Sequence, residues 1–136
     1  MLRLATQTAS NHLVPQVTEA ESQAAARAVV NLFARWGLTD AQAVTLLGGI
    51  SPRSYARWKT GDVGRVDRDL ATRLSILLGI HKALRLTFTD PHRGYGWIKR
   101  SSITFDNHTP LDIMLGGDIF SLMRVRSYLD AERGPW

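Results

Sequence analysis

The clearest structural signal in the chain lies in residues 39–61, whose sequence is TDAQAVTLLGGISPRSYARWKTG. Thr39 precedes Gln42 by three positions, which is the spacing of a capping box at the start of a helix. The helix that begins there is expected to run through Leu47, after which the glycine pair 48–49 breaks it. The first half of this stretch therefore predicts a short capped helix that ends in a tight turn.

A second short helix is expected directly after the turn. Ser51 is suited to cap it, and Pro52 then stands at the first helical position, where a backbone N–H is not needed. We expect this helix to run to about Thr60 and to end at Gly61. A short helix, a glycine-containing turn and a second capped helix are the pattern of a helix–turn–helix, which here spans residues 40–60.

The second helix carries side chains that suit contact with DNA. Arg53 and Arg57 are four residues apart and therefore share one face of the helix. Tyr55 and Trp58 lie on the opposite side, where they can pack against the preceding helix. Arginine in the major groove can bind guanine O6 and N7 or can hold phosphate, and both options stay open. The alternative is an ordinary corner between two helices with exposed arginines. The predicted DNA-binding residues are Arg53, Ser54, Arg57 and Lys59.

The rest of the chain also predicts helices, so the expected fold class is all-α with about seven helices. Each expected helix starts at or just after a residue that can cap it: Thr18, Thr39, Ser51, Asp67, Asp90, Thr109 and Asp118. The longest helix is expected over residues 67–86, with a bend or break at Gly79. Its expected inner face consists of Leu70, Leu74, Leu77, Leu78, His81 and Leu84. Residues 1–17 are expected to form a flexible arm and residues 101–109 a loop.

Positive charge is concentrated in the first two thirds of the chain. The 17 lysines and arginines, 14 of them arginine, outnumber the 12 acidic residues and give a net charge of +5. All of this excess falls in residues 1–89, because residues 90–136 contain six basic and six acidic side chains. The asymmetry favours an N-terminal part that binds a polyanion and a neutral C-terminal part with a different role.

Several classes of protein are excluded by what the sequence lacks. The chain has no cysteine, which removes disulfides, zinc ribbons and thiol nucleophiles. No apolar run is long enough for a transmembrane helix. The four histidines lack metal-ligand spacing, and the glycine pairs form no phosphate-binding loop. At 136 residues, we therefore expect a small cytoplasmic binding protein that is not an enzyme and has no cofactor, metal or membrane partner.

Two segments resemble one known family. Residues 43–61 look like the Xre-type helix–turn–helix found in antitoxins of the Xre/MbcA/ParS family. Further along, Gly-Trp-Ile at 96–98 and the stretch TPLDIMLGG at 109–117 are similar to the C-terminal toxin-binding domain of that family. The resemblance covers about residues 20–134. It implies a helix–turn–helix domain at 18–89 and a small helical toxin-binding domain at 90–136.

The resemblance also implies a function and partners. Antitoxins of this type II kind bind a RES-domain toxin, which consumes NAD or transfers ADP-ribose from it, and obstruct the toxin's active site. They commonly act as transcriptional repressors of their own operon through the helix–turn–helix. A homodimer is expected as well, because one helix–turn–helix reads only half of a palindromic operator.

The residues of the C-terminal part agree with a binding role. Aromatic residues and arginine concentrate binding energy at protein interfaces. Trp97, Leu111 and Phe120 are expected in the core. The predicted toxin-binding residues lie on or after the last helix: Arg124, Tyr128, Arg133 and Trp136. One alternative is a stand-alone helix–turn–helix regulator whose C-terminal helices serve for dimerisation or sensing. Another is an inhibitor of an enzyme whose helix–turn–helix no longer reads DNA.

Overall fold

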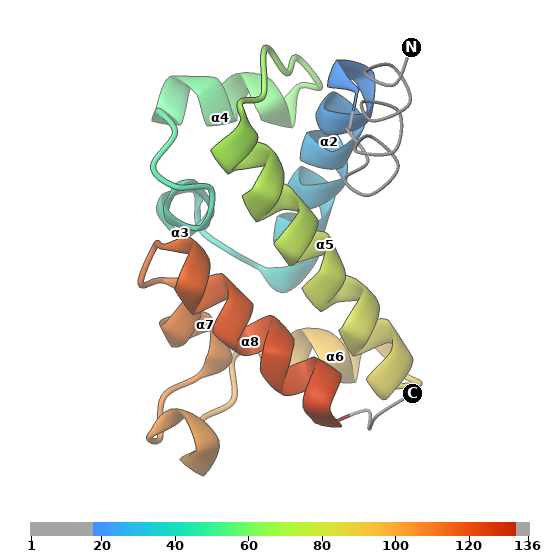
Figure 1. Cartoon of the computed structure of the whole chain (residues 1–136), viewed down its shortest axis with the longest axis vertical. Helices are drawn as coiled ribbons and strands as arrows, with labels where there is room; N and C mark the ends of the chain where they lie inside the picture. Colours follow the sequence, from blue (N-terminus) through green and yellow to red (C-terminus); the bar gives the residue numbers. More distant parts are fainter. Residues whose placement is uncertain (1–17, 133–136) are drawn as a thin grey trace, which may run out of the picture.

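The computed structural model describes residues 18–132, and all regular secondary structure in this range is helical apart from one isolated bridge between Ser102 and His108. The helices are α2 (Glu19–Trp36), α3 (Asp40–Leu46), α4 (Pro52–Lys59), α5 (Arg68–Thr87), α6 (Pro91–Trp97), the 3-10 helix η1 (Ile103–Phe105), α7 (Pro110–Met114) and α8 (Ile119–Glu132). The predicted all-α class is confirmed (Figure 1). The arm predicted for residues 1–17 lies outside the described residues.

Side-chain caps stand at the helix starts that the sequence indicates. At α3, Thr39 and Gln42 form a complete capping box, because each side chain accepts a hydrogen bond from the backbone N–H of the other residue. At α4, the hydroxyl of Ser51 accepts from the backbone N–H of Ser54. The same device recurs at the five other α-helices of the described range, where the capping side chains are Thr18 at α2, Asp67 at α5, Asp90 at α6, Thr109 at α7 and Asp118 at α8. Local sequence therefore places these helix starts without help from tertiary contacts.

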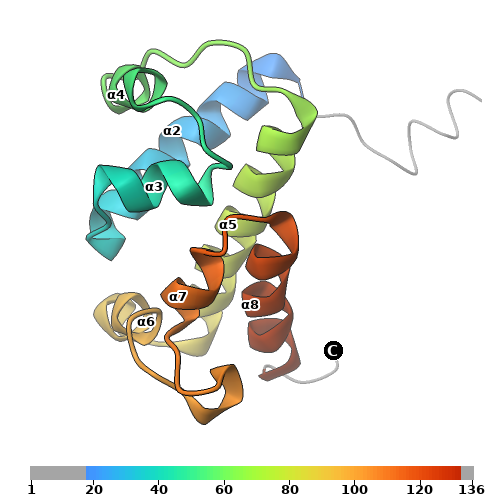
Figure 2. The same cartoon turned by 90° about the vertical axis from the view of Figure 1, so that its left-hand side faces the viewer.

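The long helix α5 lies at the centre, with α2 packed on one side and α8 on the other (Figures 1 and 2). Six residues were predicted on the inner face of α5. Leu70, Leu74, Leu77 and Leu84 are buried as predicted, whereas Leu78 and His81 are only half-buried. Four further residues of α5 are buried that the sequence pattern did not indicate: Arg73, Ile76, Ile80 and Ala83. They are buried because α5 has a second covered face. Gly79 does not interrupt the helix, and the guanidinium of Arg126 from α8 packs closely against it.

A single hydrophobic core runs through both halves of the chain. At the C-terminal end of α5, Gly94 of α6 lies against Leu84 and Phe88. The helices α7 and α8 add further fully covered side chains to the same core, among them Met114, Leu122 and Val125. The helix α5 is therefore shared by the helix–turn–helix part and the C-terminal part, as Figure 2 shows.

The three residues expected in the C-terminal core differ in how deeply they are buried. Leu111 is buried and Trp97 is half-buried, but Phe120 is 85% exposed. The expectation for Phe120 is wrong because α8 turns a different stripe into the core, consisting of Leu122, Val125 and Leu129. An α-helix advances about 100° per residue, so the side chain at position 120 lies nearly opposite that stripe.

The half-buried His81 on α5 predicts a measurable pH dependence of stability. Burial, and then the positive charges of Arg85 and Arg35, lower the pKa of His81 below its usual range. The unfolded chain then binds the proton more tightly than the folded chain. The free energy of unfolding is therefore expected to fall as the pH drops from about 6.5 through the lower pKa of the folded state. Urea unfolding at about pH 7.5 and about pH 5 should show a smaller loss in His81→Gln than in the wild type. Equal losses would contradict this origin.

Candidate functional site

The predicted helix–turn–helix is present, and its aromatic residues pack as expected. Helices α3 and α4 are joined by the turn around Gly48 and Gly49 (Figure 2). Tyr55 and Trp58 are buried, which confirms that this side of α4 faces the protein interior. Burial, with a smaller effect of the Asp40 carboxylate, also raises the pKa of Tyr55 above its usual range, so its hydroxyl stays neutral.

The four predicted DNA-binding residues differ in their surroundings. The Nζ atom of Lys59 lies 2.8 Å from Oδ2 of Asp40 in α3 and 5.6 Å from the ring centre of Tyr55. This lysine therefore connects α3 to α4 and is already paired. Ser54 is half-buried, and its hydroxyl oxygen accepts a hydrogen bond from the Ser51 hydroxyl. Arg53 and Arg57 are exposed, and no salt bridge engages either of them within residues 18–132.

The segment after α4 and the first residue of α5 add two cations that the predicted site did not include. Arg65 lies in the segment and Arg68 begins α5, and both are exposed and close in sequence to α4. The guanidinium of Arg57 lies beside Gly64, so it borders the segment that carries Arg65. The side chain of Gln23 in α2 donates to the Gly64 carbonyl at 3.4 Å and holds the segment in place. The excess of positive charge between residues 53 and 73 is the sequence signal that could have pointed to these residues.

Arg73 belongs to the same basic stretch of sequence, but its position is interior. Its side chain is about 90% buried, and Nε donates to Oδ2 of Asp69 at 2.9 Å. Its Nη1 donates to the carbonyl of Gly117, in the turn between α7 and α8, at 2.7 Å. A Cβ at Gly48 would lie only 2.7 Å from Nε of Arg73. Arg73 therefore joins the turn of the helix–turn–helix to the C-terminal part and does not face a DNA partner.

The C-terminal part contains an aromatic cluster, which we define as Trp97, Phe105 and Tyr128. The rings of Trp97 and Tyr128 are stacked, 9° from parallel with centroids 6.0 Å apart. Phe105 meets Tyr128 edge to face at 5.2 Å. The guanidinium of Arg124 lies 5.4 Å from the ring centre of Phe105 on the exposed side of the cluster. Two predicted toxin-binding residues, Arg124 and Tyr128, thus come together, whereas Arg133 and Trp136 lie outside the described residues.

Backbone hydrogen bonds close the segment at residues 101–109 that was predicted as a loop. Ser102 and His108 bridge its two ends, and the backbone N–H of Asn107 donates to the Ser102 carbonyl at 2.8 Å. Asp106 and Asn107 adopt the left-handed conformation, with φ of 56° and 66°, that lets the chain turn back. Phe105 is fully covered and anchors the loop to α8 through Tyr128.

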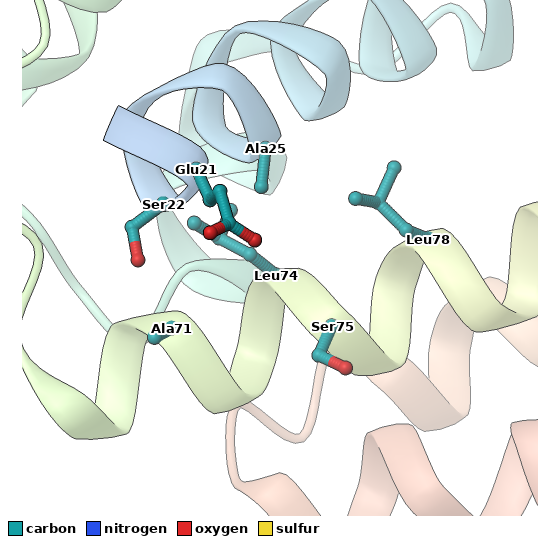
Figure 3. A pocket seen from close by; sticks show the side chains of 7 residues that line it. All are labelled: Glu21, Ser22, Ala25, Ala71, Leu74, Ser75 and Leu78. Atoms are coloured by element: carbon teal, nitrogen blue, oxygen red, sulfur yellow. The ribbon is translucent and has the colours of Figure 1, made fainter. Parts of the chain in front are cut away.

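Two cavities lie along the seam of α2 and α5. The larger, of about 260 Å³, is lined by Glu21, Ser22, Ala25, Ala71, Leu74, Ser75 and Leu78, with Glu21 the single charged side chain among them (Figure 3). The smaller, of about 210 Å³, continues past Leu78 toward Arg35 and His81.

Among residues 18–132, no group of histidine or acidic side chains is arranged to hold a metal ion. In the same range, no helix is both long enough and apolar enough to cross a membrane.

Comparison with known protein families finds a match for each half of the chain. The model of the antitoxin Xre-like helix-turn-helix domain matches residues 15–79, and that of the antitoxin Xre/MbcA/ParS C-terminal toxin-binding domain matches residues 83–135. The chain is also 38% identical over 120 residues to the uncharacterized protein y4oB of Sinorhizobium fredii (strain NBRC 101917 / NGR234), which covers 88% of this chain and 92% of the relative. The second domain implies a cognate toxin as partner, and neither domain is enzymatic. The chain therefore belongs to the Xre/MbcA/ParS family of antitoxins, with a helix–turn–helix domain followed by a toxin-binding domain.

Proposed function

We propose that this antitoxin neutralises a RES-domain toxin by binding it directly and obstructing its active site. The observation that carries the proposal is the match to the toxin-binding domain over residues 83–135, which contains the aromatic cluster and Arg124. The RES identity follows from the resemblance of the motifs at 96–98 and 109–117 to antitoxins of such toxins. The toxin contacts include Arg124 and Tyr128 and, in the last residues of the chain, Arg133 and Trp136.

Co-expression with the adjacent reading frame tests this function. We expect the adjacent product alone to stop growth and to deplete NAD or ADP-ribosylate protein, and we expect co-expression of this chain to restore growth. The two proteins should also purify as one complex. A catalytically inactivated copy of the adjacent product serves as the control, because it should bind this chain without affecting growth. Failure of both rescue and co-purification would instead favour a stand-alone regulator.

We also propose that the helix–turn–helix represses the antitoxin's own operon. Arg53 and Arg57 are exposed on α4, and the buried side of the same helix holds Tyr55 and Trp58 against the protein. Two copies would act together as a homodimer, since each reads half of a palindromic operator. Lys59 contributes by holding α4 against α3 through Asp40.

Substitution of the two arginines is expected to weaken operator binding. If Arg53 or Arg57 reads guanine, changing it to alanine should cost about 1–3 kcal/mol on the operator and little on unrelated DNA. If it holds phosphate, the loss should be similar on any sequence, and the salt dependence should fall by about one unit per contact. Fluorescence anisotropy at several salt concentrations measures both quantities. Arg35→Ala, at an exposed arginine of α2, is the matched control. Unchanged affinity in both α4 variants would remove them from the interface.

A further inference from the structure

One side of α8 carries three side chains, which we call the α8 ridge: Phe120 and Arg124, which are exposed, and Tyr128, which is half-buried in the aromatic cluster. They are spaced four residues apart and therefore lie side by side along the helix. Phe120 is 85% exposed, and Met123, one turn along on the neighbouring side, is 38% exposed. The opposite stripe of α8 is buried in the core, so the ridge is the part of the helix left for a partner.

The arginine of the ridge is held in position. The guanidinium of Arg124 lies over the ring of Phe105, and Phe105 is itself fully covered and packed edge to face on Tyr128. An arginine already ordered in this way loses less side-chain entropy on binding than a freely rotating one. Its remaining N–H groups can meet a carboxylate in a two-pronged arrangement.

A second large apolar side chain is exposed in the loop that packs on α8 through Phe105. Ile103 is 88% exposed in η1, two residues before the buried Phe105. The hydrogen bonds between Ser102, Asn107 and His108 close this loop, and the packing of Phe105 on Tyr128 joins it to α8. Large exposed apolar side chains together with a positioned arginine are the composition typical of an interface centre.

We infer that the α8 ridge, together with Ile103 of the loop that packs on α8 through Phe105, is the docking surface for the toxin. The toxin surface that fits it has an apolar recess for Phe120 and a carboxylate that faces Arg124. This inference rests on the proposed function. It is supported by the match to the toxin-binding domain, because residues 83–135 contain the whole ridge and its supporting loop.

A second copy of this chain fits the ridge less well. A two-fold pairing that brings the middle of the ridge against the same residues of a second copy would place two Arg124 guanidinium groups against each other. Like charges brought together at an interface cost several kcal/mol, whereas a carboxylate at that point attracts the arginine. Charge complementarity therefore favours the toxin as the occupant.

The test uses the full-length antitoxin and the purified protein encoded by the adjacent reading frame. The variants are Phe120→Asp and Arg124→Glu, and the matched controls are Leu86→Asp and Arg27→Glu. Leu86 is 61% exposed at the end of α5, within the matched residues 83–135 but not on α8, and Arg27 is exposed on α2, outside the matched residues. The two controls therefore make the same changes inside and outside the toxin-binding domain without altering the ridge. Phe120→Asp should leave the melting temperature unchanged or higher, because an acidic residue in the first turn of a helix is favourable.

We expect each ridge variant to lose affinity for the toxin by about thirtyfold or more, with the controls unchanged and operator binding retained. If the wild-type chain binds the toxin and the folded ridge variants bind equally well, the inference is overturned and the proposed function stands. If the wild-type chain itself does not bind, the proposed function fails and the inference fails with it. If Phe120→Asp instead abolishes self-association, the ridge is an interface between copies of this chain, which also overturns the inference.

Discussion

A chain truncated after residue 89 is expected to lose its cooperative fold, even though it keeps the whole helix–turn–helix and all of α5. The reason lies in the second buried face of α5. Ile76, Ile80 and Ala83 lie on the side of α5 where Gly79 meets Arg126 of α8. Removal of residues 90–136 exposes these three side chains, and it also uncovers Leu84, which lies against Gly94 of α6.

The expected loss is comparable to the whole stability of a small domain. Burying one Leu or Ile side chain contributes roughly 1.5–3 kcal/mol, so exposing Ile76, Ile80 and Leu84 removes about 5–9 kcal/mol. Small domains have free energies of unfolding of about 5–15 kcal/mol. The truncated chain should therefore show a broad, uncooperative thermal transition by circular dichroism and should bind a hydrophobic dye.

A matched variant separates lost packing from lost chain length. In the truncated chain, Ile76→Gln and Ile80→Gln replace exposed apolar side chains with polar ones that still favour helix. If the missing contacts with α8 cause the collapse, this double variant should recover solubility and part of the cooperativity. A truncated wild-type chain that melts like the full-length protein would show that the helix–turn–helix part is independent of α8.

Gly48→Ala is expected to destabilise the protein by about 2–4 kcal/mol, more than the same change at the neighbouring Gly49. Both glycines have positive φ, 84° and 86°, so each alanine carries the backbone strain of the left-handed conformation. At Gly48 the new Cβ would also lie 2.7 Å from Nε of Arg73, whereas at Gly49 it would meet nothing within 4 Å. Arg73 cannot move aside without losing its bonds to Asp69 and Gly117.

Urea unfolding gives the free energy of unfolding of each alanine variant. The difference between the two values isolates the effect of the contact with Arg73, because backbone strain is common to both variants. A double-mutant cycle with Arg73→Ala gives a second check, because the extra cost at Gly48 should disappear once the arginine is gone. Arg73→Ala alone should also destabilise, since it leaves the Gly117 carbonyl without its donor. Equal effects at Gly48 and Gly49, or a cost at Gly48 that persists without Arg73, would contradict this explanation.

Local features of the fold were the most predictable from the sequence. The capping residues Thr39, Ser51 and Asp90 stand at helix starts in the structure as in the prediction. The inward position of Tyr55 and Trp58 was also correct. These features depend on residues three or four positions apart, whose hydrogen bonds and helical spacing are determined within one turn.

The candidate surfaces were less predictable, because charge and aromatic content do not show which partner a side chain meets. Lys59 was predicted to bind DNA, yet it is paired with Asp40, and Arg73 of the same basic stretch of sequence is buried. Phe120 was predicted to lie in the core, but it is exposed. Whether an apolar residue of a helix is buried or exposed depends on which face of that helix a neighbouring helix covers.

The amino-acid sequence was sufficient for the all-α class, the helix starts and the helix–turn–helix, because hydrogen bonds and periodicity within short segments specify them. The tertiary structure alone showed that α5 is covered on two sides and that Arg73 joins the turn at Gly48 to the turn at Gly117. It alone also placed Phe105 under Arg124 and left Phe120 uncovered on α8. These arrangements bring together residues far apart in the chain, and their relative position follows only from how the helices pack.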